Sequence, residues 1–222
     1  MTVQVKICGL RTTETLDAAL DAGADFFGLV FYDPSPRSLP REQAARLVRH
    51  AAGRAKSVAL LVDPTDAEVQ AVIDEVNPDY LQLHGAESPE RVREIRELAG
   101  RPVIKAIKVA AAQDAAAART FDEAADLILF DAKAPEGGDA WLPGGNGIAF
   151  DWQALADVKD LDSFILSGGL DPDNVGQAIA QTGARMVDVS SGVERAPGEK
   201  DPGLVRRFVT IAKAAPATDG SS

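Results

Sequence analysis

The sequence predicts a single-domain (β/α)8 barrel, in which eight parallel strands form a ring surrounded by helices. Strand-like and helix-like segments alternate from end to end, with short Gly, Pro or Asn punctuation between them. Strands that alternate with helices are joined by parallel crossovers, and eight of them in 222 residues suggest closure into a barrel. A short motif also recurs before four of the strands, about fifty residues apart, as expected for two strand–helix units. A flavodoxin-like open sheet is the second choice, but eight strand candidates are too many for it.

The expected elements follow from short runs of apolar residues bounded by turn residues. The predicted strands are 3–8, 26–31, 57–62, 79–84, 103–108, 127–131, 163–167 and 186–190. The predicted helices are 13–22, 41–52, 65–76, 88–99, 113–120, 172–182 and 201–214, with a short one near 152–158. We assign residues 1–213 to the barrel and residues 214–222, rich in Ala, Pro, Gly and Ser, to a flexible C-terminal tail.

The recurring motif places small or turn-forming residues directly before a strand. Its four copies are Gly23-Ala24-Asp25, Asn77-Pro78-Asp79, Ala124-Ala125-Asp126 and Gly183-Ala184-Arg185. This pattern is expected if the barrel grew from a repeated quarter. The alternative is coincidence, because glycine is common at helix ends.

Composition limits the classes of partner. The net charge of −11 argues against nucleic acid or an anionic membrane surface. No apolar run is long enough to span a membrane, and the N-terminus enters a strand without a signal-like segment. A single cysteine excludes an internal disulfide and fits a reducing compartment. We therefore expect a cytoplasmic protein that acts on a small molecule.

The only cysteine, Cys8, ends the first predicted strand. Val3, Val5 and Ile7 share one face of that strand, which leaves Cys8 on the polar face just before Gly9. Thr12 or Thr13 then offers an N-cap to the next helix. The carboxyl ends of barrel strands are where catalytic groups collect. The alternative is a small buried apolar residue, which is the usual environment of a free cysteine.

Alternation on the other strands brings further polar side chains to the same end of the barrel. On strand 79–84, Gln82 and His84 should face inward, and on strand 127–131 Asp131 should do so. On strand 103–108 we place Ile104 and Ala106 outward and Lys105 inward. Singly, Lys105 and Lys6 fit interior ion pairs, and Asp131 fits a cap. Their convergence at the strand ends favours an active site.

Glycine-rich segments after the last two strands indicate an anion site. Ser167-Gly168-Gly169-Leu170 leads into Asp171-Pro172, which predicts a helix N-cap followed by proline at the first helical position. Ser190-Ser191-Gly192-Val193 follows the eighth strand. Glycines let backbone N–H groups approach an anion, and barrels commonly bind phosphate with these two loops. Ordinary turns are the alternative for either loop alone.

Two other loops extend the expected site. Residues 32–38 contain two prolines and present Arg37, whose planar guanidinium suits a carboxylate. Residues 135–147 contain five glycines and are interpreted either as a lid or as a flexible connector.

Taken together, the motifs resemble one enzyme family. In order they are KICGLR (6–11), SPR (35–37), QLHG (82–85), LFDAK (129–133), GGNGIAFDW (144–152), SGGLDPDNV (167–175) and DVSSGVE (188–194). From Val3 to about Phe208 the chain resembles phosphoribosylanthranilate isomerase, a single-domain barrel of tryptophan biosynthesis. Asn146, where the family more often has Thr or Ser, and Ser38, where an aromatic residue is commoner, depart from the pattern.

The resemblance implies an Amadori rearrangement of N-(5′-phosphoribosyl)anthranilate to 1-(2-carboxyphenylamino)-1-deoxyribulose 5-phosphate. It makes Cys8 the general base, Asp131 the general acid and Arg37 the ligand of the anthranilate carboxylate. It also places substrate beside Gln82, His84 and Asp188. The implied phosphate ligands are the backbone amides around Gly168, Gly169, Ser191 and Gly192.

The chemistry asks for the same two groups. Opening the ribose ring needs a proton on its ring oxygen, and removal of the C2′ proton then gives an enolamine that becomes the ketose. One acid and one base suffice, so we expect no metal and no cofactor. Asp131 must be protonated to donate, and desolvation should favour that form. Cys8 must be a thiolate; at an ordinary thiol pKa this costs only about 2 kcal/mol, so Lys6 or helix dipoles need supply little.

Three rival functions are considered. The equivalent isomerase of histidine biosynthesis resembles a double repeat with aspartates at both catalytic strand ends, which Cys8 does not match. An indole-glycerol-phosphate synthase needs a lysine–glutamate pair that the sequence does not place. A non-catalytic phosphosugar-binding barrel would not need both Cys8 and Asp131. The sequence leaves open whether the protein is a monomer or a homodimer, and whether it has a side activity on the histidine-pathway substrate.

Overall fold

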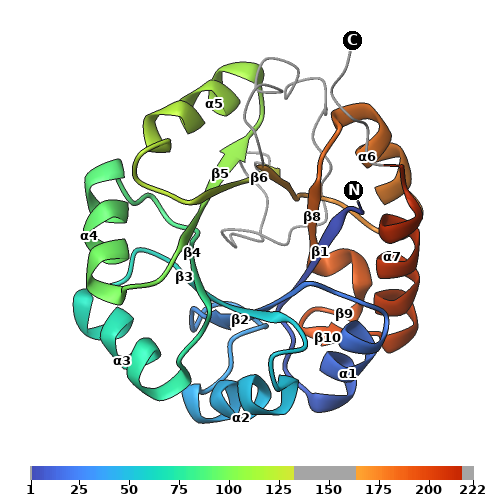
Figure 1. Cartoon of the computed structure of the whole chain (residues 1–222), viewed down its shortest axis with the longest axis horizontal. Helices are drawn as coiled ribbons and strands as arrows, with labels where there is room; N and C mark the ends of the chain where they lie inside the picture. Colours follow the sequence, from blue (N-terminus) through green and yellow to red (C-terminus); the bar gives the residue numbers. More distant parts are fainter. Residues whose placement is uncertain (1, 133–163, 217–222) are drawn as a thin grey trace.

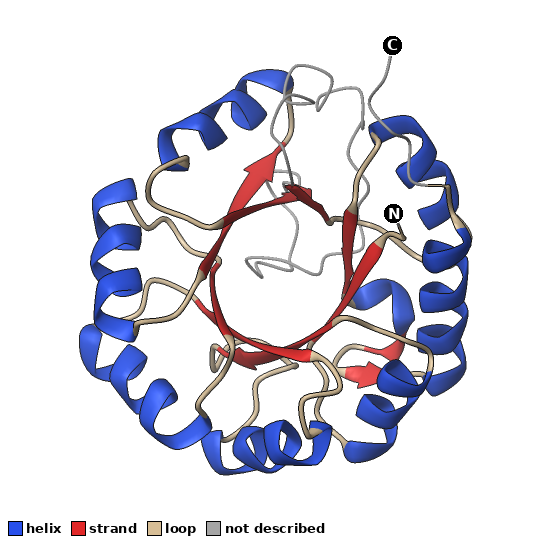
Figure 2. Cartoon of the chain, viewed as in Figure 1, coloured by secondary structure: helices blue, strands red, loops and turns tan. Residues whose placement is uncertain are grey.

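Eight parallel strands close into a barrel in the computed structural model, which describes residues 2–132 and 164–216 (Figure 1). Each strand pairs with the next in the chain, and β8 returns to β1 with Gln4 opposite Met186. Helices surround the ring of strands (Figure 2). The predicted (β/α)8 barrel is therefore confirmed.

The strands begin and end within one residue of their predicted bounds. They are β1 (Gln4–Cys8), β2 (Phe26–Phe31), β3 (Lys56–Leu61), β4 (Tyr80–Leu83), β5 (Val103–Val109), β6 (Leu127–Ala132), β7 (Phe164–Leu166) and β8 (Met186–Val189). Short apolar runs between turn residues were therefore a sufficient signal for every strand of the barrel.

The helices are α1 (Thr13–Asp21), α2 (Arg41–Ala51), α3 (Asp66–Val76), α4 (Pro89–Ala99), α5 (Ala112–Ala116), α6 (Val175–Thr182) and α7 (Pro202–Ala214). Side-chain caps fix the start of several of them. Thr12 accepts from Thr15 N as predicted, and Thr65 forms a capping box with Glu68 at α3. The helix expected near 152–158 lies outside the described residues, as does the tail from 217 onward.

Two helices differ from their predicted form. The segment predicted as one helix over 113–120 is α5 followed by the 3-10 helix η1 (Ala117–Phe121). Helix α6 begins at Val175 instead of 172. Asp171 accepts the backbone N–H groups of Asp173 and Asn174, so it stabilises a separate turn ahead of the helix.

Apolar side chains fill two separate layers. The larger layer lies between the strands and the helices and includes Leu81, Leu83, Ile128 and Phe130, as alternation predicts. A smaller cluster fills the barrel interior and consists of Phe26, Val58, Ile104, Ala106, Leu129, Ile165 and Met186. The polar ends of the inward-facing rows lie above this cluster, so the interior core supports the site from below.

The prediction for β5 is wrong. Ile104 and Ala106 belong to the interior cluster, and Lys105 points outward. Its Nζ lies 2.7 Å from Glu87 Oε2 and 2.8 Å from the carbonyl oxygen of Gly85, in the loop after β4. The pattern misled because both faces of β5 are largely apolar. The long lysine stem passes through the outer layer and brings its charge to a buried carboxylate.

The recurring motif has a structural role at the amino ends of the strands. Asp25 accepts from Val5 N (2.7 Å), Asp79 from Ser57 N (2.9 Å) and Asp126 from Val103 N (2.8 Å). Each aspartate therefore lies directly before an even-numbered strand (β2, β4 or β6) and bonds the odd-numbered strand that precedes it in the chain (β1, β3 or β5). In the fourth copy, where Arg185 replaces aspartate, the Arg185 carbonyl accepts from Gln4 N instead.

A small hairpin follows β8 and was not predicted. After the 3-10 helix η3 (Ser191–Val193), β9 (Glu194–Ala196) pairs antiparallel with β10 (Glu199–Lys200). Pro197-Gly198 at its turn was the available signal. Across residues 2–132 and 164–216, no helix has the length and apolar character needed to cross a membrane.

Candidate functional site

Cys8 occupies an inward-facing position at the carboxyl end of β1. It clusters with Val30 and Leu60 from the next two strands, and its side chain is nearly buried. Gly28 lies opposite Cys8 on β2, and a Cβ there would come within 2.9 Å of the thiol Sγ. The absence of a side chain at Gly28 therefore provides the space that the thiol occupies.

The electrostatic environment of Cys8 is mixed. Burial raises the pKa of the Cys8 thiol above its usual value and Asp188 adds to the increase, while Lys6, Lys200 and Arg37 oppose it. The net direction is upward, so the expectation that the thiolate needs little help is wrong. Desolvation is the reason, and it makes the three cations around Cys8 important for any reaction that uses the thiolate.

Lys6 and Asp188 form an ion pair inside the barrel. The distance from Lys6 Nζ to Asp188 Oδ1 is 3.0 Å, and Ser167 Oγ donates to Asp188 Oδ2 at 3.3 Å. Burial alone would lower the pKa of Lys6, but Asp188 and Cys8 outweigh it and raise that pKa. Lys6 is thus held as a cation beside the thiol, and Asp188 uses both its oxygens within the protein.

Asp131 lies inward at the end of β6 and is bonded to a polar row on β4. His84 Nε2 lies 3.2 Å from Asp131 Oδ2, and Gln82 Nε2 lies 2.9 Å from His84 Nδ1. All three side chains are nearly buried, as expected for inward-facing residues. Gln82 Oε1 has no bonding partner in the described structure. The imidazole thus orients the carboxyl group, and the glutamine orients the imidazole.

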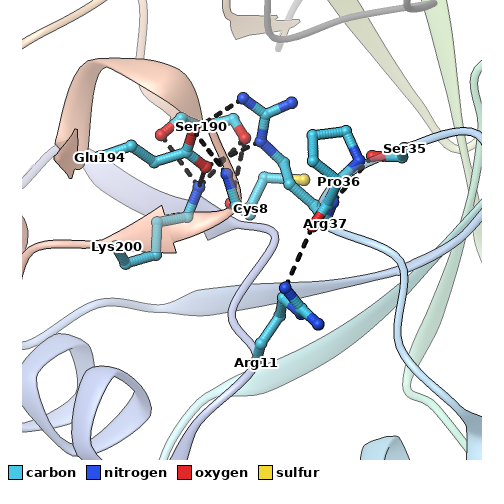
Figure 3. A network of polar contacts seen from close by, with 9 residues as sticks. Cys8, Arg11, Ser35, Pro36, Arg37, Ser190, Glu194 and Lys200 are labelled. Carbon is cyan, nitrogen blue, oxygen red and sulfur yellow. Dashed lines mark hydrogen bonds and ion pairs between the residues drawn. The ribbon is translucent and has the colours of Figure 1, made fainter. Parts of the chain in front are cut away.

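Arg37 is drawn into a buried cluster of charges instead of projecting from its loop (Figure 3). Its Nε and Nη2 each lie 2.8 Å from one carboxylate oxygen of Glu194. Lys200 Nζ lies 2.5 Å from Glu194 Oε1. Burial alone would raise the pKa of Glu194, but Arg37 and Lys200 outweigh it and lower that pKa. The same cluster reaches Cys8, because Ser190 Oγ donates to the Cys8 carbonyl oxygen at 3.2 Å.

The two glycine-rich loops predicted to bind an anion lie against each other. Gly168 and Gly169 adopt positive φ angles of 85° and 65°. A Cβ at Gly192 would collide with the carbonyl oxygen of Leu170, so only glycine allows this approach between the loops. Ser191 and Gly192 lie in η3, directly after β8. The arrangement places the two loops in contact after β7 and β8.

The sequence singles out Cys8, Asp131 and Arg37 but not Glu194 or Lys200, which the structure places in one cluster with Arg37. Glu194 was visible only as the last letter of DVSSGVE, and Lys200 carried no signal because the hairpin was not expected. Residues 135–147, with Asn146, lie outside the described residues. In the described part of the chain, no group of His, Cys, Asp and Glu side chains is arranged to hold a metal ion.

Comparison with known proteins identifies relatives that match nearly the whole chain. The family model for N-(5′-phosphoribosyl)anthranilate (PRA) isomerase matches residues 5–211. An N-(5′-phosphoribosyl)anthranilate isomerase of Rhodopseudomonas palustris (strain BisB5) is 51% identical over 214 residues, covering 96% of this chain and 97% of the relative. That of Parvibaculum lavamentivorans is 48% identical over 215 residues, covering 97% and 100%.

Solved structures agree with the sequence relatives. The phosphoribosyl anthranilate isomerase of Thermotoga maritima superposes with a TM-score of 0.85 at 36% identity, covering 95% of this chain and 98% of that one. A phosphoribosyl anthranilate isomerase in complex with reduced 1-(o-carboxyphenylamino)-1-deoxyribulose 5-phosphate gives 0.82 at 34% identity, with the same coverage. The match extends over nearly the whole chain in sequence and in structure, and the chain belongs to the N-(5′-phosphoribosyl)anthranilate isomerase family.

Proposed function

We propose that this protein is an aldose–ketose isomerase of tryptophan biosynthesis that converts N-(5′-phosphoribosyl)anthranilate to 1-(2-carboxyphenylamino)-1-deoxyribulose 5-phosphate. The observation that carries the proposal is the placement of a thiol and a carboxyl group, Cys8 and Asp131, on inward-facing positions at the same end of one barrel. The reaction needs one base and one acid on a single sugar, and a strand-end site can present both.

Asp131 acts as the general acid. It protonates the ring oxygen of the ribose, and the ring opens to a Schiff base between C1′ and the anthranilate nitrogen. The contact with His84 supports this role, because it fixes the orientation of the carboxyl group before substrate arrives. Gln82 in turn fixes the imidazole.

Cys8 acts as the general base. As a thiolate it removes the proton from C2′, the electrons move toward the protonated nitrogen, and the resulting enolamine tautomerises to the ketose. Because burial raises the pKa of Cys8, the thiolate depends on the surrounding cations. Lys6 is suited to this role, since Asp188 holds it as a cation in the barrel interior.

Substrate binding uses the two ends of the ligand. Arg37 binds the anthranilate carboxylate, and its position beside Glu194 supplies a fixed guanidinium. The phosphate is held by backbone N–H groups around Gly168, Gly169, Ser191 and Gly192, and Asp188 lies near the ribose hydroxyls. A reaction product of this class, in reduced form, is the ligand of one of the related structures.

The rival functions are less well supported. The histidine-pathway isomerase is not favoured, because the family model and the relatives are those of the tryptophan-pathway enzyme. A non-catalytic binding barrel would have no use for both Cys8 and Asp131. The single cysteine and the pathway support a cytoplasmic enzyme that works as a monomer or homodimer on a phosphosugar.

An assay of the purified protein with both aminoaldose phosphates tests the proposal. We expect loss of the fluorescence of the anthranilate adduct on addition of enzyme, and turnover of the tryptophan-pathway substrate far above that of the histidine-pathway one. Binding of phosphoribosylanthranilate without turnover would support the non-catalytic alternative instead.

A further inference from the structure

The hairpin after β8 carries two charged side chains, Glu194 and Lys200, to which the proposed mechanism assigns no contact with substrate. The side chains of Glu194 and Lys200 are only 4% and 1% exposed. Removing a carboxylate and an ammonium group from water is costly, and a buried pair is often no more stable than apolar side chains of similar size. Stability alone therefore does not explain why these two charges are placed beside the site.

Glu194 binds Arg37 in a bidentate geometry that fixes the plane of the guanidinium. Both carboxylate oxygens are used, each 2.8 Å from a different nitrogen of the guanidinium. Two parallel N–H···O bonds of this kind set the rotation of the guanidinium as well as its position. The Arg37 side chain also lies close to Gly9, where a Cβ would come within 2.8 Å of Arg37 Cδ. The arginine stem therefore passes directly over the turn that follows Cys8.

Lys200 holds Glu194 from the other side. Its Nζ bonds Glu194 Oε1 at 2.5 Å, the Ser190 carbonyl oxygen at 3.0 Å and Ser190 Oγ at 3.2 Å (Figure 3). An ammonium group has three donors, so these contacts account for all of them. The register of the hairpin, with Lys200 opposite Glu194, produces this contact.

We propose that Glu194 is a positioning residue that orients the Arg37 guanidinium toward the substrate carboxylate, and that the β9–β10 hairpin exists at this place to hold it. The inference rests on the proposed function, in which Arg37 binds anthranilate. Geometry supports it, because Glu194 holds Nε and Nη2 of Arg37 and is itself held by Lys200.

The test compares Glu194→Gln with the wild type on two substrates. One is N-(5′-phosphoribosyl)anthranilate, and the other is the phosphoribosyl adduct of aniline, which lacks the carboxylate. With the first we expect KM to rise roughly 10- to 100-fold, the range for a lost charge-assisted hydrogen bond, while kcat changes much less. With the aniline adduct we expect equal KM values for variant and wild type. The matched control is Glu199→Gln, an exposed carboxylate on the same hairpin paired with Arg195, which should match wild type on both.

A double-variant cycle shows whether Glu194 acts through Arg37. Adding Glu194→Gln to Arg37→Ala should raise KM no further than Arg37→Ala alone. If Glu194→Gln proves unfolded by circular dichroism, Glu194→Asp replaces it, since it keeps the charge and withdraws the carboxylate by one methylene. An equal rise in KM for both substrates, or an unchanged KM, would overturn the positioning role while leaving the isomerase activity established. A wild-type enzyme that does not turn over phosphoribosylanthranilate would overturn the function and the inference together.

Discussion

Both ends of this barrel use carboxylates that face cations, but those at the amino ends also bond a neighbouring strand and are less buried. At the amino ends of the strands, Asp25, Asp79 and Asp126 accept hydrogen bonds from backbone N–H groups of the neighbouring strand. At the carboxyl ends, Asp188 and Glu194 are bonded to the cationic side chains of lysine and arginine. The first group joins neighbouring strands, and the second lies in the charged surroundings of Cys8 and Arg37.

Exposure separates the two groups energetically. The side chains of Asp79 and Asp126 are 38% and 41% exposed, so they keep much of their hydration. Those of Asp188 and Glu194 are 5% and 4% exposed, and their desolvation must be offset by their partners. The amino-end carboxylates therefore contribute to stability at little cost, whereas the desolvation of Asp188 and Glu194 is explained by the roles proposed for them beside Cys8 and Arg37.

The largest effect on activity is expected from the two reacting groups. Cys8→Ala and Asp131→Asn should each lower kcat by more than about a hundredfold, because each removes the acid or the base from the rearrangement. Cys8→Ser is the matched control for shape, since it keeps a small side chain but not an accessible anion, and it should be equally inactive. Thermal melting should show that all three variants remain folded. Near-normal turnover in Cys8→Ala or Cys8→Ser would show that the thiol is not the base. Near-normal turnover in Asp131→Asn would show that this carboxyl group is not the acid.

A smaller effect is expected when a cation near the thiol is removed. Lys200 lowers the pKa of Cys8, so Lys200→Met should raise that pKa further. A higher pKa means less thiolate at neutral pH, and the acidic limb of the kcat/KM profile should therefore move to higher pH. Arg195→Met, on the exposed side of the same hairpin, is the control and should leave the limb in place. An unmoved limb in Lys200→Met would show that this cation does not reach the base.

The barrel itself could be predicted from sequence because each strand is a short apolar run bounded by turn residues, and this signal is local. On β4 the faces followed from alternation, since Leu81 and Leu83 alternate with Gln82 and His84. On β6 both faces are apolar, and Asp131 at the end of the strand was the polar residue that marked the inward face. On β5 alternation failed, because apolar residues occupy both faces and the polar character of Lys105 was an unreliable guide. A lysine reaches a distant partner through its stem, so its charge does not reveal which way its Cα–Cβ bond points.

The candidate site could be predicted only where a motif carried it. Cys8, Asp131 and Arg37 stand in such motifs, but the partner of Arg37 depends on a hairpin whose two strands are two or three residues long. The pairing of Glu194 with Arg37 is a contact between segments far apart in the chain, and nothing in the local pattern specifies it. Burial of the thiol is likewise a property of the closed barrel, and its effect on the pKa of Cys8 could not be derived from neighbouring residues.

The smallest effect on activity is expected at the amino ends of the strands. Asp79→Ala leaves the backbone N–H of Ser57, a buried residue, without its acceptor, which should lower the free energy of unfolding by about 1–3 kcal/mol. Urea denaturation measures this loss as a lower midpoint with an unchanged slope. Activity of the folded variant should equal that of the wild type, because the change lies at the end of the barrel opposite the site. A loss of kcat comparable to that of Cys8→Ala would show that the amino ends of the strands also affect catalysis.

The pH dependence of this loss gives a sharper form of the same test. Burial alone would raise the pKa of Asp79, but Ser57 and Lys56 outweigh it and lower that pKa. A carboxyl group whose folded-state pKa is depressed stabilises the protein above its unfolded-state pKa of about 3.9, and this stability is lost as the pH falls through the lower folded-state value. The difference in unfolding free energy between wild type and Asp79→Ala should therefore be constant near neutral pH and shrink in acid. A difference that does not change down to the most acidic pH at which the protein is folded would mean that Asp79 acts through packing, and the hydrogen bond to Ser57 would not be the source of its contribution.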